Sequence, residues 1–357
     1  MENKRLESLD ALRGFDMLFI TGLGGLISAL CAIFGASDSW LDIQMHHAEW
    51  DGLRQHDTIF PLFLFIAGVT FPFSFEKNRE HIYRKIFKRA AVLILLGIVY
   101  NGLFELDFAN LRFYSVLGRI GLAWMGAALL YVWFGRKTRA AICAALLAGY
   151  CLLCLIPAPD AAGAGSLTKD GCLVGWIDRC IFPGHLCYGN FDPEGLLSAI
   201  PAVVTAMLGI FSGELLRRKD ISGNRKTLVL LAATVVLLAA GLVLSIWFPI
   251  NKKLWSSSFV LVVGAYSTAM LALFYWIIDV KGWRKWAFPL KVVGVNSIAI
   301  YMLPCIINLG YTARFFFGGV ISFCSEGWAQ AISNAAYLLV AWLIIYFLYR
   351  QKIFIKV

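Results

Sequence analysis

Hydrophobic residues run along this chain in long continuous stretches, which short clusters of charged residues separate. A helix needs roughly 20 apolar residues to cross the hydrocarbon core of a bilayer, and these stretches approach that length. They lack the alternation with polar residues that marks the strands of a membrane barrel. The pattern therefore predicts an all-α, polytopic membrane bundle. About ten transmembrane helices are expected, at 11–34, 57–75, 90–105, 113–134, 140–157, 195–215, 228–248, 255–278, 287–309 and 328–349.

Composition strengthens this prediction. Of the 357 residues, 60% are hydrophobic and 15% are charged, whereas a soluble domain has about 45–50% apolar and about 25% charged residues. So large an apolar excess excludes both a soluble globular domain and a disordered chain. We expect one transmembrane domain over 1–357 in contact with the lipid bilayer, with outer loops at about 35–56, 158–193, 249–254 and 310–327.

The distribution of Lys and Arg sets the predicted orientation. With the N-terminus inside, the inner segments hold 22 of the 32 basic residues and the outer segments hold seven. Positively charged loops stay on the cytoplasmic side, so both termini are expected there. The formal net charge of +10 then reflects topology, and no nucleic-acid partner is needed to explain it.

Cysteine and histidine spacing add little to the picture. Predicted outer loops contain Cys172, Cys180, Cys187 and Cys324. An oxidising compartment would allow these thiols to form disulfides, but their spacing does not fix a pairing. The histidines match no strong zinc-binding spacing, so we expect no metal site.

A polar segment precedes the second predicted helix. It reads Met45-His46-His47-Ala48-Glu49-Trp50-Asp51-Gly52-Leu53-Arg54-Gln55-His56-Asp57. Histidine is the side chain best suited to take up a proton near neutral pH. An aromatic ring beside carboxylates can stack on a sugar and accept its hydroxyl and amine protons. The segment is therefore either a sugar-directed catalytic site or a solvated loop with histidines of no special role.

Three further polar segments border or interrupt the predicted helices. They contribute Asp192 and Glu194 before 195–215, and Asn251 and Lys253 before 255–278, which begins with Trp255. The last segment contributes Asn296 and Ser297 within 287–309. Polar residues inside apolar spans are costly and usually functional. Each of them could cap a helix or bond to a neighbouring helix. Together they predict a polar cavity that opens outward.

These segments resemble, in order, the motifs of the heparan-α-glucosaminide N-acetyltransferase family. The matching residues are Leu9-Asp10-Ala11-Leu12-Arg13-Gly14-Phe15, His47-Ala48-Glu49-Trp50-Asp51-Gly52, Asp57, residues 60–68 and 191–197, Asn251-Lys252-Lys253-Leu254-Trp255 and Gly294-Val295-Asn296-Ser297. They span nearly the whole chain. The chain departs from the family at one place: members carry an Asn late in the first helix, where this sequence reads Thr21-Gly22-Leu23-Gly24-Gly25.

The resemblance implies an acyltransferase that moves an acetyl group across the membrane. Its co-substrate would be cytoplasmic acetyl-CoA, and its acceptor the amine of a terminal glucosamine or related amino sugar on the periplasmic side. The family pattern places the catalytic histidine at His47. Because only a short segment precedes the first motif, the resemblance suits an integral protein of the bacterial inner membrane. A homodimer is one assembly that we consider for it.

The chemistry of acyl transfer then assigns expected roles. His47 would act as general base or as acetyl carrier, and Asp57 or Glu49 would orient its imidazole. The oxyanion would be stabilised by Asn296, Ser297 or Asn251. The remaining residues would bind substrates: Trp50, Asp192, Glu194, Lys253 and Trp255 the sugar, and Arg13 and Arg119 the phosphates of CoA.

Two other functions fit the same polar residues. Helices carrying Asp16, Arg119 and Asn296 would also suit a transporter for a sugar or a proton-coupled solute, although the sequence shows no internal repeat. A hydroxyl acceptor would use a similar base, so an O-acetyltransferase of a cell-envelope glycan is the other alternative.

Overall fold

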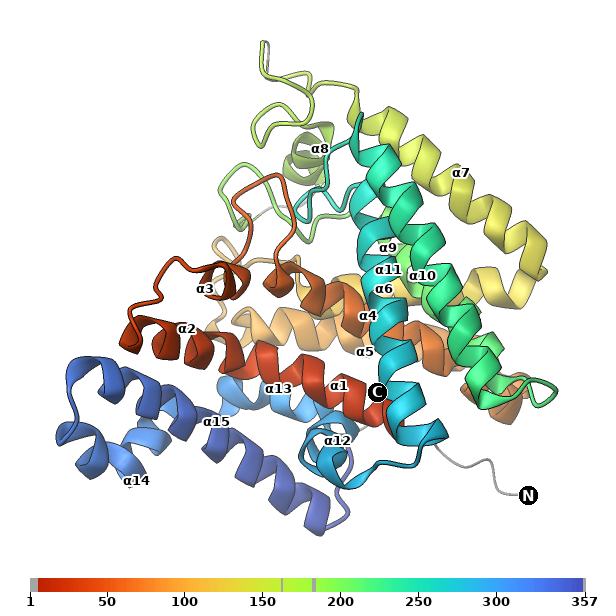
Figure 1. The fold of residues 1–357 in the computed structure, drawn as a ribbon. Helices are drawn as coiled ribbons and strands as arrows, with labels where there is room; N and C mark the ends of the chain where they lie inside the picture. Colours follow the sequence, from red (N-terminus) through yellow and green to blue (C-terminus); the bar gives the residue numbers. More distant parts are fainter. Residues whose placement is uncertain (1–5, 162, 182–183, 356–357) are drawn as a thin grey trace.

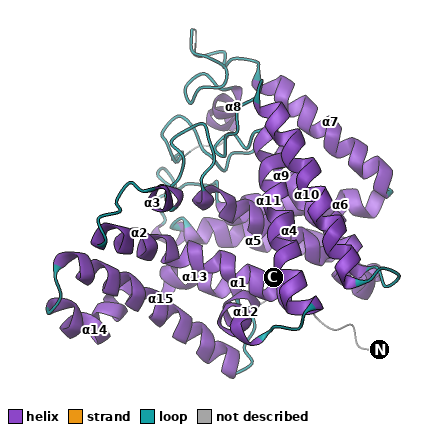
Figure 2. Cartoon of the chain, in the orientation of Figure 1, coloured by secondary structure: helices purple, strands orange, loops and turns teal. Residues whose placement is uncertain are grey.

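The computed structural model describes residues 6–161, 163–181 and 184–355, and in these ranges it contains helices and loops but no β-strand (Figure 1, Figure 2). Eight helical segments of these ranges are long and apolar enough to cross a membrane. They are α1 (Glu7–Leu18) joined by a π-helical turn to α2 (Gly24–Ile33), α4 (Gln55–Phe75), α6 (Val116–Trp133), α7 (Arg136–Cys154), α9 (Ala199–Arg217), α10 (Gly223–Ser245), α11 (Ser257–Phe274) and α15 (Glu326–Arg350). The prediction of an all-α membrane bundle is confirmed.

The remaining helices are shorter or carry more charge. α12 (Phe288–Val295) and α13 (Ser297–Ile306) make a ninth span if they count as one helix that bends by 59°. Outside these spans lie α3 (Trp40–Gln44), α5 (Ile82–Tyr100), α8 (Leu173–Ile181) and α14 (Leu309–Ser322).

Two predicted segments differ from the structure. The span expected at 90–105 lies in α5, which is not among the eight because its first turns carry Arg84, Lys85, Lys88 and Arg89. The outer loop expected at 310–327 is mostly α14, whose 14 residues extend about 21 Å. A helix of that length is too short to cross a bilayer. The apolar run of this segment is therefore too short for the sequence pattern to indicate a helix.

Close contact between α4 and α9 forms the centre of the bundle. A Cβ atom added to Gly68 would lie 2.0 Å from the carbonyl oxygen of Ala206, and one added to Gly209 would lie 2.0 Å from that of Phe65. The two backbones therefore touch at glycine positions, as in close helix pairs within membranes. This contact fixes the position of α4, whose first turn carries Asp57.

The long loops gather at one end of the bundle, around α3 and α8 (Figure 2). The helices α4, α6, α9 and α11 all begin at the loops of this end. We call it the outer end, following the orientation predicted from Lys and Arg, and call the opposite end the inner end.

The cysteines of the outer loops are not joined. All nine cysteines are free thiols in the structure, so the disulfides considered for Cys172, Cys180, Cys187 and Cys324 are not formed. Cys172 is buried in an apolar cluster with Tyr150 and Phe248. The thiol of Cys324, which follows α14, donates instead to the carbonyl oxygen of Val320 in that helix, at 3.3 Å.

Candidate active site

His47 and Asp57 form a hydrogen-bonded pair at the start of α4. Nδ1 of His47 lies 2.7 Å from Oδ1 of Asp57. The other carboxylate oxygen of Asp57 accepts the backbone N–H groups of Ala48 and Arg54, each at 3.1 Å. Arg54 is the N-cap residue of α4, so Asp57 also closes the first turn of this helix. The structure brings these two predicted residues together, whereas the side chain of Glu49, the other candidate, is exposed to solvent.

This geometry defines which histidine nitrogen is available. Asp57 is buried, with 1% of its side chain exposed, whereas 51% of the His47 side chain is exposed. A carboxylate that accepts from Nδ1 holds the neutral imidazole in the tautomer whose Nε2 carries a lone pair. Nε2 can therefore accept a proton from a substrate.

Lys252 also lies against the imidazole of His47. Its Nζ is 3.1 Å from Nδ1 and 3.5 Å from Nε2 of His47, and 3.5 Å from Oδ1 of Asp57. Burial lowers the pKa of the Lys252 ammonium, and the Asp57 carboxylate opposes that shift. Sequence reasoning missed this residue, since it selected the adjacent Lys253; the only signal was the pair of lysines in an otherwise apolar segment.

His56 completes this group of side chains. Its ring lies edge-on to the ring of His47, with 4.4 Å between the two centroids. Gly24 of α2 lies on the other side of the His56 ring, where an added Cβ would be 3.6 Å from Nδ1. The first helical segment and α4 therefore meet beside His47.

Asn251 joins two loops rather than facing a substrate. Its Oδ1 accepts the backbone N–H of Leu254 at 2.8 Å, and its Nδ2 donates to Oδ1 of Asp51 at 3.0 Å. The N–H of Gly52 donates to the carbonyl oxygen of Ile250 at 2.8 Å. Asn251 is fully buried, so these contacts indicate a structural use of its amide, and the oxyanion role stays a prediction.

The two tryptophans of the predicted sugar site have different environments. Trp255 is fully buried, packs on Phe60 and lies beneath the guanidinium of Arg119, 4.9 Å from its ring centroid. A ring enclosed in this way offers no face to a sugar, which corrects the expectation for Trp255. Trp50 is only partly buried. The ammonium of Lys253 lies 5.9 Å from the Trp50 ring centroid and bonds to the carbonyl oxygen of Glu49.

Asp192 and Glu194 are held by Arg112, which sequence reasoning also missed. Nε and Nη2 of Arg112 each lie 2.7 Å from a carboxylate oxygen of Asp192, and Nη2 also contacts Glu194. Asp192 accepts two further bonds, from the backbone N–H groups of Cys187 and Glu194. Asp192 is fully buried and its oxygens are occupied, so it anchors the loop. Glu194 retains 10% side-chain exposure.

The two arginines assigned to CoA lie far apart. Nη2 of Arg13 is 3.3 Å from the hydroxyl of Thr70, whereas Arg119 contacts Ser198 and lies over the ring of Phe60. Phe60 and Thr70 are ten residues apart on α4, a separation of about 15 Å. Arg119 therefore lies in the outer half of the bundle, apart from Arg13, and a role of both arginines in binding CoA stays a prediction.

Asn296 binds the C-terminal segment. This residue separates α12 from α13, its Nδ2 donates to the carbonyl oxygen of Ile353, and its Oδ1 accepts the N–H of Ile355, both at 3.0 Å. Asn296 is fully buried. Its amide therefore holds the backbone beyond α15 in this structure, and the oxyanion role stays a prediction. Ser297 lines a narrow apolar cavity together with Met17, Phe60 and Tyr301.

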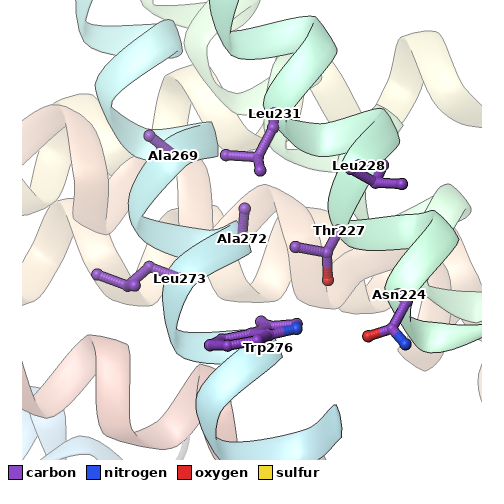
Figure 3. A pocket seen from close by; sticks show the side chains of 8 residues that line it. All are labelled: Asn224, Thr227, Leu228, Leu231, Ala269, Ala272, Leu273 and Trp276. Atoms are coloured by element: carbon purple, nitrogen blue, oxygen red, sulfur yellow. The ribbon is translucent and has the colours of Figure 1, made fainter.

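An apolar groove between α10 and α11 lies apart from these residues (Figure 3). It is lined by Asn224, Thr227, Leu228, Leu231, Ala269, Ala272, Leu273 and Trp276. Asn224 belongs to the first turn of α10 and Trp276 follows α11, so the groove lies at the inner end. None of its lining side chains ionises near neutral pH, so it offers no acid–base chemistry.

In the described part of the chain, no group of three or more His, Cys, Asp or Glu side chains is arranged to hold a metal ion.

Comparison with known proteins agrees with the motifs. No protein-family model matches the chain. The sequence is 26% identical to heparan-alpha-glucosaminide N-acetyltransferase of Homo sapiens and 25% identical to the protein of the same name from Mus musculus. Each alignment covers 99% of this chain and 60% of the relative, so the chain spans about three fifths of the length of these proteins. Across that length, the chain is similar in sequence to heparan-alpha-glucosaminide N-acetyltransferase.

Proposed function

We propose that this protein is a transmembrane N-acetyltransferase that uses acetyl-CoA to acetylate the amine of a terminal glucosamine or related amino sugar. The observation that carries the proposal is the His47–Asp57 pair, at the position where the sequence motif places the catalytic histidine. Both relatives are named for the same reaction class. A pair of this kind is how enzymes hold an imidazole as general base.

The proposed reaction uses Nε2 of His47. The amine nitrogen attacks the thioester carbonyl carbon and forms the C–N bond, while Nε2 takes a proton from that nitrogen. The C–S bond then breaks, and the imidazolium returns the proton to the CoA thiolate. The products are the N-acetyl sugar and the CoA thiol, so atoms and electrons balance without another reactant.

A covalent route is the alternative within the same function. Nε2 would attack the carbonyl carbon first, and CoA would leave as the thiolate. The amine would then take the acetyl group from the acetyl-imidazolium, and the proton released by the amine would pass to the thiolate. Labelled acetyl-CoA without an acceptor separates the two routes. Stoichiometric label on the His47 peptide after rapid acid quenching supports the covalent route, and its absence supports direct transfer.

Two observations support entry of acetyl-CoA from the inner end. Arg13 and Arg89 lie close enough to repel each other, and the guanidinium of Arg89 stacks 4.2 Å from the ring centroid of Trp124. A phosphate between two guanidinium groups would relieve this repulsion. The small apolar cavity between the inner and outer ends is lined by Met17, one turn beyond Arg13, and by Phe60, one turn beyond Asp57. The pantetheine arm would widen and follow this cavity, and the acceptor would bind at the outer end, which in our proposal is the periplasmic side of a bacterial inner membrane.

The exposed rim around His47 would bind the sugar. Trp50 would supply a ring face, and Glu49 and Glu194 would accept hydroxyl or amine protons. The ammonium of Lys253 lies 4.8 Å from the ring centroid of Tyr188, so this lysine joins Trp50 and Tyr188 into one surface above the imidazole.

The decisive experiment uses purified protein in liposomes, with acetyl-CoA on one side and glucosamine on the other. We expect N-acetylglucosamine, measured by mass, and no product from His47→Ala. His46→Ala is the matched control, because His46 is exposed and contacts Asp42 and Ser28, which have no role in the proposed reaction. Full activity of His47→Ala would contradict the assignment. Solute uptake without product would indicate the transporter, and an acetyl ester cleaved by hydroxylamine would indicate an O-acetyltransferase.

A further inference from the structure

Acyl transfer requires a donor for the carbonyl oxygen that becomes anionic during attack. The amides of Asn251 and Asn296 are committed to backbone and loop contacts. Both side chains are also fully buried, so neither amide is presented to a substrate at the exposed imidazole of His47. The proposed site therefore needs another donor next to Nε2 of His47.

Lys252 lies where that donor is needed. Its Nζ is 3.5 Å from Nε2 of His47, about one hydrogen-bond length from the atom that would face the amine. An ammonium carries three N–H donors, and Asp57 and the imidazole do not exhaust them. The side chain keeps 18% exposure, so it is sheltered yet in contact with the space in front of His47.

The backbone of Lys252 is fixed, which keeps its ammonium in place. The N–H of Trp255 donates to the carbonyl oxygen of Lys252 at 3.0 Å. Asn251 and the buried Trp255 flank the turn on either side. A donor that is held before the reaction begins stabilises charge without reorganisation, which is the source of its catalytic effect.

We propose that Nζ of Lys252 donates a hydrogen bond to the thioester carbonyl oxygen and stabilises the oxyanion that forms beside His47. This inference rests on the proposed function. As the C–N bond forms, the carbonyl π electrons move to oxygen, and an N–H of Lys252 holds that charge. When the C–S bond breaks, the same electrons restore the carbonyl. Lys252 loses no proton in the cycle, and His47 carries out the proton transfer.

The arrangement also explains why lysine suits this position. Its ammonium lies 3.5 Å from both Nε2 of His47 and Oδ1 of Asp57, so one cation is close to the base and to the carboxylate beside it. The charged and titratable groups that face Lys252 are His47, His56 and Asp57 at the start of α4, Glu194 before α9, and Arg119 on α6. The Asp57 carboxylate contacts both the ammonium of Lys252 and the imidazole of His47, so it fixes the position of the two groups relative to each other.

The test compares Lys252→Met, Lys252→Gln and Lys252→Arg in liposomes. We expect Met and Gln to lower kcat by about 100- to 1,000-fold, with the KM for acetyl-CoA changed less than threefold. The Lys252→Arg variant keeps the positive charge, so its kcat should be at least ten times that of the Lys252→Met variant. Lys169→Met, on the outer loop, is the control and should match the wild type. The comparison uses whichever neutral variant keeps the wild-type melting temperature.

The outcomes separate this inference from the proposed function. Wild-type kcat in a folded neutral Lys252 variant, with His47→Ala inactive, overturns the role of Lys252 and leaves the function intact. A rise in KM at unchanged kcat also overturns it, because the contact would then act in the ground state. An active His47→Ala variant would instead overturn the proposed function.

Discussion

One carboxylate, that of Asp57, holds both the imidazole of His47 and the first turn of α4. Oδ1 lies 2.7 Å from Nδ1 of His47, while Oδ2 accepts the N–H of Arg54 at 3.1 Å. The same contact that ends the loop and starts the helix therefore also sets the tautomer of the proposed base. Catalytic geometry and helix initiation depend on one side chain.

Asp57→Asn should lower kcat by about 100- to 10,000-fold, because an amide can donate to Nδ1 and would stabilise the wrong tautomer. The Asn side chain can still accept the N–H of Arg54. The free energy of unfolding should therefore fall by only about 1 kcal/mol, the contribution of a helix cap. Steady-state kinetics and thermal unfolding measure the two effects. Glu105→Gln, an exposed outer-loop carboxylate, serves as control. Equal activity in both variants would contradict the orienting role of Asp57.

Arg112→Met should strongly destabilise the protein, because it leaves the buried carboxylate of Asp192 unpaired. Removing one partner of a buried ion pair costs about 3–5 kcal/mol. Arg179→Met is the matched comparison, since Arg179 pairs with Asp160, whose side chain is 48% exposed, and such a pair contributes about 1 kcal/mol or less. Thermal unfolding in detergent should show the larger loss for Arg112. Equal losses would count against the anchoring role of Arg112.

Asn296→Ala should leave kcat within about threefold of the wild type, because its amide binds the C-terminal backbone. Loss of an oxyanion donor would instead lower kcat by about 100- to 1,000-fold. The N–H of Ile355 donates to Asn296, so its hydrogen exchange should become faster in the variant. A large fall in kcat without faster exchange would restore the oxyanion role.

Asp178 should make stability depend on pH. Burial raises the pKa of this α8 carboxyl from its ordinary value of 3.8 to about 6. A raised folded-state pKa means that the native state binds the proton more tightly, so stability from this group is lost as pH rises from about 4 through about 6. The wild type should therefore lose about 1–3 kcal/mol between pH 4 and pH 7 from this group. Asp178→Asn should lose less over the same range; an identical pH dependence in both proteins would refute this.

Gly68→Ala should prevent correct packing of α4 on α9. Its Cβ would lie 2.0 Å from the carbonyl oxygen of Ala206, a separation that requires the backbones to move apart. Gly149→Ala in α7 meets no atom within 4 Å and should be tolerated or mildly stabilising. Monodispersity after detergent extraction and the melting temperature measure both variants. A well-folded Gly68→Ala protein would show that the helix contact is not essential.

Much of the fold and one half of the candidate site could be predicted from sequence. Continuous apolar runs identify spans because the bilayer imposes a fixed length on any helix that crosses it. The π-helical turn after α1 and the break at Asn296 were not predicted, since both depend on how the helices pack. His47 and Asp57 could be paired because only ten residues separate them.

The partners of these residues depend on tertiary structure. Lys252 reaches His47 across 205 residues of sequence, and Arg112 reaches Asp192 across 80. No local pattern encodes such contacts, because they depend on how loops fold over the outer end. The same packing buries Trp255 and places the amides of Asn251 and Asn296 in hydrogen bonds with loops and backbone. These residue types are suited to catalysis, but here they hold segments of the chain together.

The sequence by itself determined that the chain is a helical membrane protein with a histidine–carboxylate pair at the start of a helix, because hydropathy and short-range spacing are local properties. Only the tertiary structure decided which polar side chains surround that pair. Hydrogen-bond capacity is finite, and a buried amide or carboxylate that is satisfied by the backbone is no longer available to a substrate. That accounting disfavours Asn251, Asp192 and Asn296 and leaves Lys252 beside His47.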